Sequence, residues 1–267
     1  MKHIKQAFLV IASLLIFSCT NEPTPNQEGT DYKAARDVTD RTEPGKIPEI
    51  LKYHKTRESE LLYPFSVKPV KQQYDYLEPV IKEKSLENHY MLHEKYVDSL
   101  NKLVINHGFE NSKVFTFFEE SDEYPQDLLF YAGGHYNHTI LWHTVLPPVG
   151  SGPEGKLKEK IMEQYTSFGN FRNLILDKAN ELEKNGWVWL AVDYDGNLFV
   201  STTTGNRNPI MKEISPRGIP IMAIDLWEHA YQEDYEGSKE SYLQNVLKII
   251  DWDEVQRRYM EQYVVKE

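Results

Sequence analysis

Cysteine is almost absent from this sequence. The 267 residues contain a single cysteine, Cys19, so the chain cannot form an internal disulfide in any compartment. A metal ion bound by this chain must therefore be held by histidine nitrogens and by oxygen ligands.

Basic residues are also in short supply relative to acidic ones. The formal net charge of −11 argues against a nucleic-acid partner, because a phosphate backbone selects for a basic surface. Hydrophobic residues make up 40% of the chain, which is enough to bury a substantial core. We therefore expect a globular protein.

The apolar stretch near the N-terminus is too short to span a bilayer. It runs from Ala7 to Phe17 after a basic start, a pattern typical of a removable export signal. Cys19 follows in the tetrapeptide IFSC, which resembles the lipobox of bacterial lipoproteins. We expect residues 1–19 to be a lipoprotein signal peptide and Cys19 to carry the lipid. The exported protein would then be anchored to a bacterial membrane, on its periplasmic or cell-surface side. An ordinary signal peptide with a chance cysteine is the alternative.

The composition divides the rest of the chain into three parts. Residues 20–63 are polar and rich in Pro, Glu, Thr and Asn without a sustained period, so we interpret them as a flexible tether. Globular patterning follows, and the segment LPPVGSGPEG marks a boundary within it. We expect a helical-hairpin domain over residues 64–149 and an α+β metal-binding domain over residues 150–267.

Hydrophobic periodicity predicts the individual elements. The first helix is expected to start with Ser85 as its cap, and further helices are expected from Trp227 to near the C-terminus. The turn sequence YDG predicts an antiparallel hairpin. The predicted fold class is α+β: a helical hairpin, then an α/β domain with a three-stranded antiparallel sheet, and a metal site between the two. The first helix and the three that follow it are predicted over residues 85–107, 125–144, 154–167 and 170–184, and the strands over 187–193, 197–203 and 219–225.

Three histidines and one aspartate stand out on separate predicted segments. His89 is on the first helix, His138 is on the second, and Asp225 ends the third strand four positions before His229. Three imidazoles and one carboxylate suit Fe, Mn or Zn and leave room for a solvent molecule on the ion. An open position on the metal indicates catalysis more than a structural role.

Four segments of the sequence closely resemble the iron/manganese superoxide dismutases. They are YDYLEPVIKEKSLENHY, GGHYNHTILW, NGWVWLAVDYDGNLFVST and DLWEHAYQEDY, and they occur in the family's order. The last contains the family signature DxWEHAY. The resemblance covers roughly residues 65–262. It implies that the chain converts superoxide to oxygen and hydrogen peroxide by redox cycling of one bound Mn or Fe ion, with Mn slightly favoured. It also implies that the ligands are His89, His138, Asp225 and His229.

The resemblance further implies roles for side chains beside the ligands. His93, Tyr96 and Asn206 would relay protons. Gly134 matches the manganese-type members, which carry an active-site glutamine on a later β segment, and the corresponding position here is Asn206. His135 is expected to lie beside the site without binding the metal.

Other matched positions point to a pocket wall and to a subunit interface. Glu228 would reach the other subunit's ligand His229, and Gln232, which replaces a tyrosine of the family, would hydrogen-bond His93 across the same interface. We expect a homodimer or a homotetramer. The pocket wall is expected to consist of Trp187, Trp189 and Trp227.

The sequence departs from the family pattern at several of these positions. Tyr96 lies seven residues after His89, where the family has eight, which predicts a plain α-helix without a π-type bulge. Asn206 is one methylene shorter than glutamine, so its bond to solvent on the metal is expected to be longer or lost. Leu92 replaces a lysine at the channel mouth, and Lys239 aligns with a funnel arginine.

Two other functions stay open at this point. A catalytically impaired lipoprotein could use the same fold as a metal-binding or interaction module. A zinc hydrolase could use the same ligands, although no positioned general base is evident.

Overall fold

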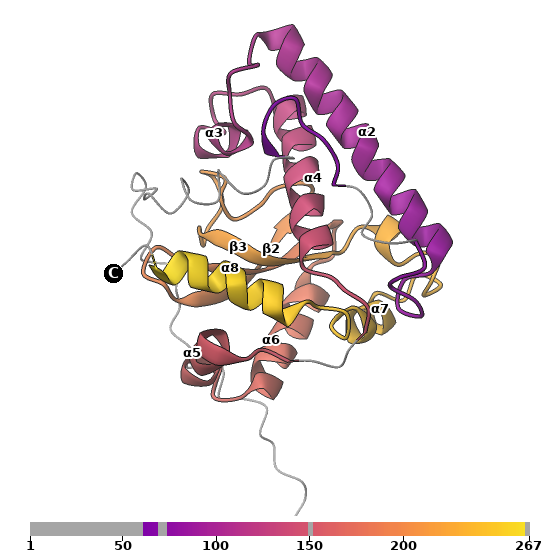
Figure 1. Ribbon diagram of the computed structural model, residues 1–267, viewed down its shortest axis with the longest axis vertical. Helices are drawn as coiled ribbons and strands as arrows, with labels where there is room; N and C mark the ends of the chain where they lie inside the picture. The colour runs from indigo at the N-terminus through magenta and orange to yellow at the C-terminus, as the bar shows by residue number, and fades with distance from the viewer. Residues whose placement is uncertain (1–60, 69–73, 149–151, 265–267) are drawn as a thin grey trace, which may run out of the picture. The chain divides into compact units, whose positions relative to one another are not determined.

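The computed structural model describes residues 61–68, 74–148 and 152–264 (Figure 1). The predicted signal peptide with Cys19, and the predicted tether as far as residue 60, lie outside the described residues. Within the described ranges, no helix combines the length and the apolar composition needed to cross a membrane.

The N-terminal half of the described chain is a helical hairpin. Helices α2 (Glu83–His107) and α4 (Gln126–His143) pack against each other, and the short helix α3 (Val114–Glu119) lies in the connection between them, where no helix was predicted. α2 buries one face at helical spacing, and it ends at Gly108, whose φ of 74° is the left-handed conformation that glycine adopts without a steric penalty. The buried residues of α2 include Leu86, Tyr90, His93, Val97, Leu100 and Val104.

The start of α2 differs from the prediction. Ser85 is not the N-cap: it lies inside the first turn, and its hydroxyl donates to Asp234 Oδ1 at 2.7 Å. The other oxygen of Asp234 accepts a hydrogen bond from the Lys82 backbone N–H at 2.9 Å. A carboxylate from far along the chain therefore binds the N–H group of the residue before the helix and the Ser85 hydroxyl, which local sequence does not reveal, while the nearby Glu78 accepts from the Glu83 N–H at 3.1 Å.

The rest of α2 is as predicted. The helix runs without a π turn from Glu83 to His107, so the plain helix expected from the seven-residue spacing of His89 and Tyr96 is confirmed.

The C-terminal half contains the predicted three-stranded antiparallel sheet. The strands β1 (Gly186–Val192), β2 (Leu198–Thr204) and β3 (Ile219–Asp225) are ordered β2-β1-β3. The hairpin turn forms because Asp193 Oδ1 accepts hydrogen bonds from the N–H groups of Asp195 and Asn197, both at 2.8 Å. β1 is central and buried along its whole length, and its register pairs Trp187 with Asp225.

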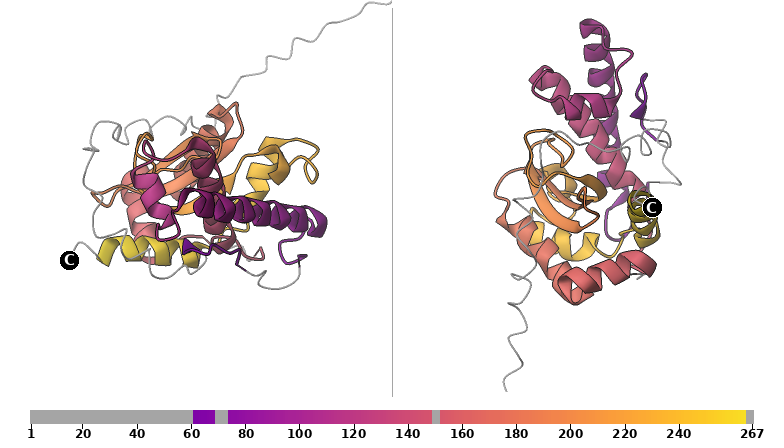
Figure 2. Two further views of the ribbon diagram at one scale, coloured as in Figure 1. Left: turned by 90° about the horizontal axis from the view of Figure 1, so that it is seen from above. Right: turned by 90° about the vertical axis from the view of Figure 1, so that its left-hand side faces the viewer.

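Helices cover the sheet from two sides. α5 (Gly155–Tyr165) and α6 (Phe168–Glu181) pack together, and α6 also packs against β1 and β2. Helix α4 packs against β3, and so does α8 (Trp252–Val264). Figures 1 and 2 show the α2–α4 hairpin and the α5–α6 pair at opposite ends of the sheet.

The segment after β3 corrects the prediction of a helix from Trp227. Only one 3₁₀ turn, η4 (Glu228–Ala230), forms there, and the chain then continues through turns to Gly237, where φ is 79°. The helices begin later, with α7 (Lys239–Val246). Asp225 sets the geometry at the start, because its Oδ1 accepts a hydrogen bond from the Trp227 backbone N–H at 2.8 Å.

Candidate metal centre

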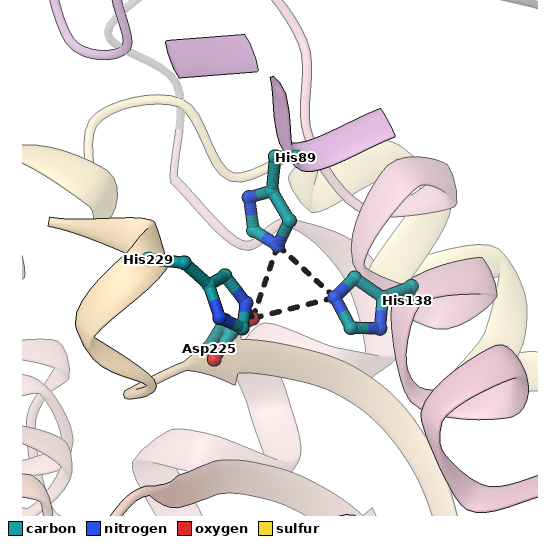
Figure 3. Close-up of side chains that lie close together, drawn as sticks. All are labelled: His89, His138, Asp225 and His229. Atoms are coloured by element: carbon teal, nitrogen blue, oxygen red, sulfur yellow. Dashed lines mark hydrogen bonds and ion pairs between the residues drawn. The ribbon is translucent and has the colours of Figure 1, made fainter. Parts of the chain in front are cut away.

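Four side chains from four different elements meet where the hairpin contacts the sheet. His89 comes from α2, His138 from α4, Asp225 from the end of β3 and His229 from η4 (Figure 3). One ligand atom of each lies within 4.8 Å of one ligand atom of every other. The structure therefore brings together the whole predicted ligand set.

The distances within this cluster fit a single ion. Asp225 Oδ2 lies 3.1 Å from His89 Nε2 and 3.0 Å from His229 Nε2, and the His89 and His138 Nε2 atoms are 3.0 Å apart. An ion bound at about 2.0–2.2 Å from two ligands at a right angle would hold them about 3 Å apart. The cluster can hold one metal ion, and three nitrogens with one oxygen suit manganese or iron.

Hydrogen bonds orient two of the ligands toward the centre. His138 Nδ1 donates to the Gly134 carbonyl at 2.7 Å, which leaves the Nε2 lone pair of His138 facing the other ligands. The Trp227 backbone N–H occupies Oδ1 of Asp225, so Oδ2 is the oxygen that points into the cluster.

Burial sets the protonation states that a metal site requires. It lowers the pKa of His138 to about 3 and also lowers the pKa of His89, so both imidazoles are neutral near pH 7. Burial alone would raise the pKa of Asp225, but the adjacent His229 and His89 outweigh it and lower that pKa. Two neutral imidazoles and a carboxylate are ready to bind a cation without first losing protons.

Comparisons with known proteins agree with this geometry. Residues 64–146 match the alpha-hairpin domain of the iron/manganese superoxide dismutases, and residues 153–258 match their C-terminal domain. A superoxide dismutase [Mn/Fe] of Porphyromonas gingivalis is 36% identical over 186 residues, which are 69% of this chain and 94% of the relative. The chain belongs to the iron/manganese superoxide dismutase family. The predicted boundary between residues 149 and 150 falls between the two matched segments.

Other relatives carry different metals in their names. A superoxide dismutase [Fe] of Coxiella burnetii is 34% identical over 184 residues, 68% of this chain and 92% of the relative. A superoxide dismutase [Mn] of Thermus thermophilus is 34% identical over 200 residues, 72% of this chain and 95% of the relative. The similarity of these superoxide dismutases to this chain therefore does not indicate whether this chain binds iron or manganese.

Gly134 makes room for two of the residues expected to relay protons in this family member. A Cβ atom at Gly134 would lie 2.8 Å from Asn206 Nδ2 and 3.1 Å from the Tyr96 ring. The Tyr96 ring centroid is 5.4 Å from that of His138. Burial raises the pKa of Tyr96, and a hydrogen bond with Asn206 partly offsets that increase. The hydroxyl is therefore protonated near neutral pH.

Asn206 makes a contact that the sequence did not predict. Its Nδ2 donates to the Phe130 carbonyl at 3.1 Å. One amide N–H is thus committed to the backbone of α4, and the expected bond from Asn206 to solvent on the metal stays a prediction.

Two of the three predicted tryptophans contact ligand rings, and the third packs against one of them. The Trp187 ring contacts His138 edge-on at 5.0 Å and lies 5.7 Å from Trp189, while Trp227 stacks with His229 at 5.9 Å. Trp189 is fixed by a hydrogen bond from its Nε1 to Thr203 Oγ1 at 2.9 Å. Such rings limit the access of water to the centre.

Trp142 also belongs to the site, and the sequence reasoning missed its role. Its ring lies 4.7 Å from His89, and its Nε1 donates to His93 Nδ1 at 3.1 Å. The signal in the sequence was its position one helical turn after His138. His93 itself lies as expected beside the ligands, and burial lowers its pKa well below the usual range.

Lys239 binds the end of a helix, and its expected role in a substrate funnel stays a prediction. Its Nζ donates to the carbonyls of Ala179 and Leu182 at 2.9 and 2.7 Å, at the C-terminal end of α6. Burial lowers the pKa of Lys239. This ammonium group stabilises the end of a helix, where the partial charge is negative.

Glu228 and Gln232 are exposed on the surface near His229. Their roles at a subunit interface stay predictions, since the structure contains one chain.

Proposed function

We propose that this chain is a superoxide dismutase that uses one bound manganese or iron ion. The observation that carries the proposal is the convergence of the ligand atoms of His89, His138, Asp225 and His229 within 4.8 Å. The names of the relatives from Porphyromonas gingivalis and Coxiella burnetii support the same activity.

The reaction consumes two superoxide ions and two protons and yields one oxygen and one hydrogen peroxide. A bound manganese or iron ion supplies the one-electron transfers in both directions. The four ligand residues would hold the ion in a pocket where His138 and Asp225 have no exposed surface and where Trp187 and Trp227 pack against ligand rings.

Tyr96 is suited to interact with the anionic substrate. Its hydroxyl keeps its proton near neutral pH and can donate a hydrogen bond to an anion, and its ring packs beside His138. Asn206 would hold the hydroxyl in place, because Asn206 is only 3% exposed and its side chain lies beside Gly134 and Tyr96.

The decisive experiment measures superoxide loss catalysed by the full chain loaded separately with manganese and with iron. We expect at least one loaded form to be active and the Asp225→Ala variant to lose both metal and activity. If both loaded forms bind metal and neither is faster than Asp225→Ala, the chain is a metal-binding module and the proposal is wrong.

We also propose that residues 1–19 direct export and that Cys19 carries a lipid anchor. The basic start, short apolar stretch and IFSC sequence support this, and residues 20–63 would then tether the globular part to a bacterial membrane. Expression in a bacterial host followed by membrane fractionation tests it. Wild type should be in the membrane fraction and Cys19→Ala in the soluble fraction, and equal distribution of the two would refute the anchor.

We further propose that the assembled enzyme is a homodimer or homotetramer, with Glu228 and Gln232 at the interface. The exposure of both residues next to His229 supports a surface that another copy could cover. Sedimentation equilibrium of wild type and Glu228→Ala tests this, and a wild-type monomer at micromolar concentration would exclude it.

A further inference from the structure

Two buried histidines that are not among the four ligands form a pair next to the metal centre. His93 lies one turn after His89 on α2, and His135 lies three residues before His138 on α4. His93 Nε2 and His135 Nδ1 are 2.8 Å apart, and the exposed fractions of the two residues are 1% and 0%.

A third side chain determines where the protons of this pair reside. The indole of Trp142 donates from Nε1 to His93 Nδ1 at 3.1 Å. An indole N–H is only a donor, so Nδ1 of His93 must be the acceptor. A neutral His93 then carries its proton on Nε2 and donates it to Nδ1 of His135. By the same reasoning, a neutral His135 carries its proton on Nε2.

The orientation of His93 matters because its ring lies against the hairpin ligands. The rings of His93 and His138 are stacked at 5.2 Å with an interplanar angle of 25°. Trp142, on the other side of the hydrogen bond, packs edge-on against His89 at 4.7 Å. A rotation of the His93 ring would therefore disturb the packing of both ligands.

We infer that His135 is a positioning residue that accepts the Nε2 proton of His93 and, together with Trp142, fixes the tautomer and ring orientation of His93, so that the polar network beside the metal centre closes within one chain. His93 has its Nδ1 lone pair bound to Trp142 and its Nε2 proton bound to His135. Neither nitrogen is left for Gln232 of a second copy, which differs from the interface contact expected from the sequence. The inference deepens the proposed function, on which its importance for catalysis rests.

His135 variants separate this role from simple packing. Asn places an amide oxygen close to the position of the imidazole Nδ1, so His135→Asn retains the acceptor, whereas His135→Val removes it and leaves a buried N–H unpaired. Gln232→Ala is the matched control for a contact across an interface.

The first measurement is a long-range ¹H–¹⁵N spectrum of the zinc-loaded full chain labelled at histidine. In wild type we expect His93 to be protonated at Nε2 and unprotonated at Nδ1. The His93 signals should stay at their wild-type positions in His135→Asn and Gln232→Ala and shift in His135→Val, where the Nε2–H loses its acceptor.

The second measurement is the visible absorption and midpoint potential of the manganese- or iron-loaded chain. Both should shift in His135→Val and return toward wild type in His135→Asn, and superoxide turnover should fall about tenfold or more in His135→Val.

Several results would overturn the inference. These are a proton on Nδ1 of wild-type His93, unchanged His93 signals in His135→Val, or a change in Gln232→Ala as large as in His135→Val. If wild-type His93 shows the expected tautomer and the variants behave as expected while the loaded chain lacks superoxide activity, the inference stands and the proposed function fails.

Discussion

The two halves of the metal centre hold their ligands in different ways. His89 and His138 project from the interiors of two packed helices, and their side chains are 4% and 0% exposed. His229 comes from a three-residue 3₁₀ turn and is 27% exposed, although its neighbour Asp225 is fully buried.

This difference shows where the centre is preorganised. The hairpin ligands are held by aromatic packing and by the bond from His138 to Gly134, which do not depend on a metal. His229 is held by its contact with Asp225 and by ring contacts with Trp227 and His89. Among the described residues, no hydrogen bond to the backbone of a helix supports it in the way that the Gly134 carbonyl supports His138. We therefore expect the hairpin half to be rigid with or without the ion, and the half after β3 to depend on it.

The packing of helix α4 against the segment after β2 should be disrupted most severely by a substitution at Gly133. A Cβ atom there would lie 2.0 Å from the Asn206 carbonyl oxygen, which is backbone and cannot rotate away. The corresponding atom at Gly134 would meet the Asn206 side chain at 2.8 Å, which can move. In denaturant unfolding, Gly134→Ala should cost about 1–3 kcal/mol and Gly133→Ala more than that. Equal losses for the two variants would contradict the close approach of the Asn206 backbone to Gly133.

Metal removal should sharpen the contrast between the halves. We expect hydrogen exchange of residues 226–238 to accelerate in the metal-free chain, while the buried amides of α2 and α4 keep their protection. Asp225→Ala should behave like the metal-free wild type. Equal acceleration in α4 and in residues 226–238 would show that the hairpin is not preorganised.

A loss of stability smaller than that of Gly133→Ala is expected when the hydrogen-bond acceptor of Trp189 is removed. Thr203→Val leaves the buried Nε1 of Trp189 without its acceptor, which should destabilise the protein by about 1–3 kcal/mol in chemical denaturation. Thr202→Val, at a partly exposed position on the opposite face of β2, is the control and should change stability little. Similar losses in both variants would mean that the hydrogen bond contributes nothing specific.

The smallest effect is expected far from the ligands, at Lys239. Lys239→Met removes the cation that binds the last carbonyls of α6, which should cost about 0.3–1 kcal/mol. The exposed Lys248→Met serves as a control for the loss of one positive charge. A large fall in superoxide turnover for Lys239→Met, absent in Lys248→Met, would instead restore the substrate-funnel role suggested by the sequence.

Sequence patterns predicted the elements that depend on local periodicity. The continuous apolar run of β1, the YDG turn and the one-sided burial of α2 are all local signals, and the structure confirms the sheet and the plain helix. The predictions failed where a distant side chain replaced a local one. Ser85 was expected to cap α2, but its hydroxyl donates instead to Asp234, 149 residues away in the sequence. A helix was expected at Trp227, but the bond to Asp225 and the following turns delay the helix to Lys239.

By itself, the sequence determined which chemical groups are available to this protein. With one cysteine, a metal site had to be built from imidazoles and oxygen, and the spacing of Asp225 and His229 together with the family motifs identified the ligands. Only the tertiary structure decided how these groups are oriented. The hydrogen-bond partners of His93, Asn206 and Lys239 lie on other elements, 42 to 76 positions away in the sequence. These distant contacts decide which nitrogen of His93 carries the proton and which carbonyls accept from Asn206 and Lys239. Such contacts form only when the folded chain excludes water and leaves each buried polar group with few available partners.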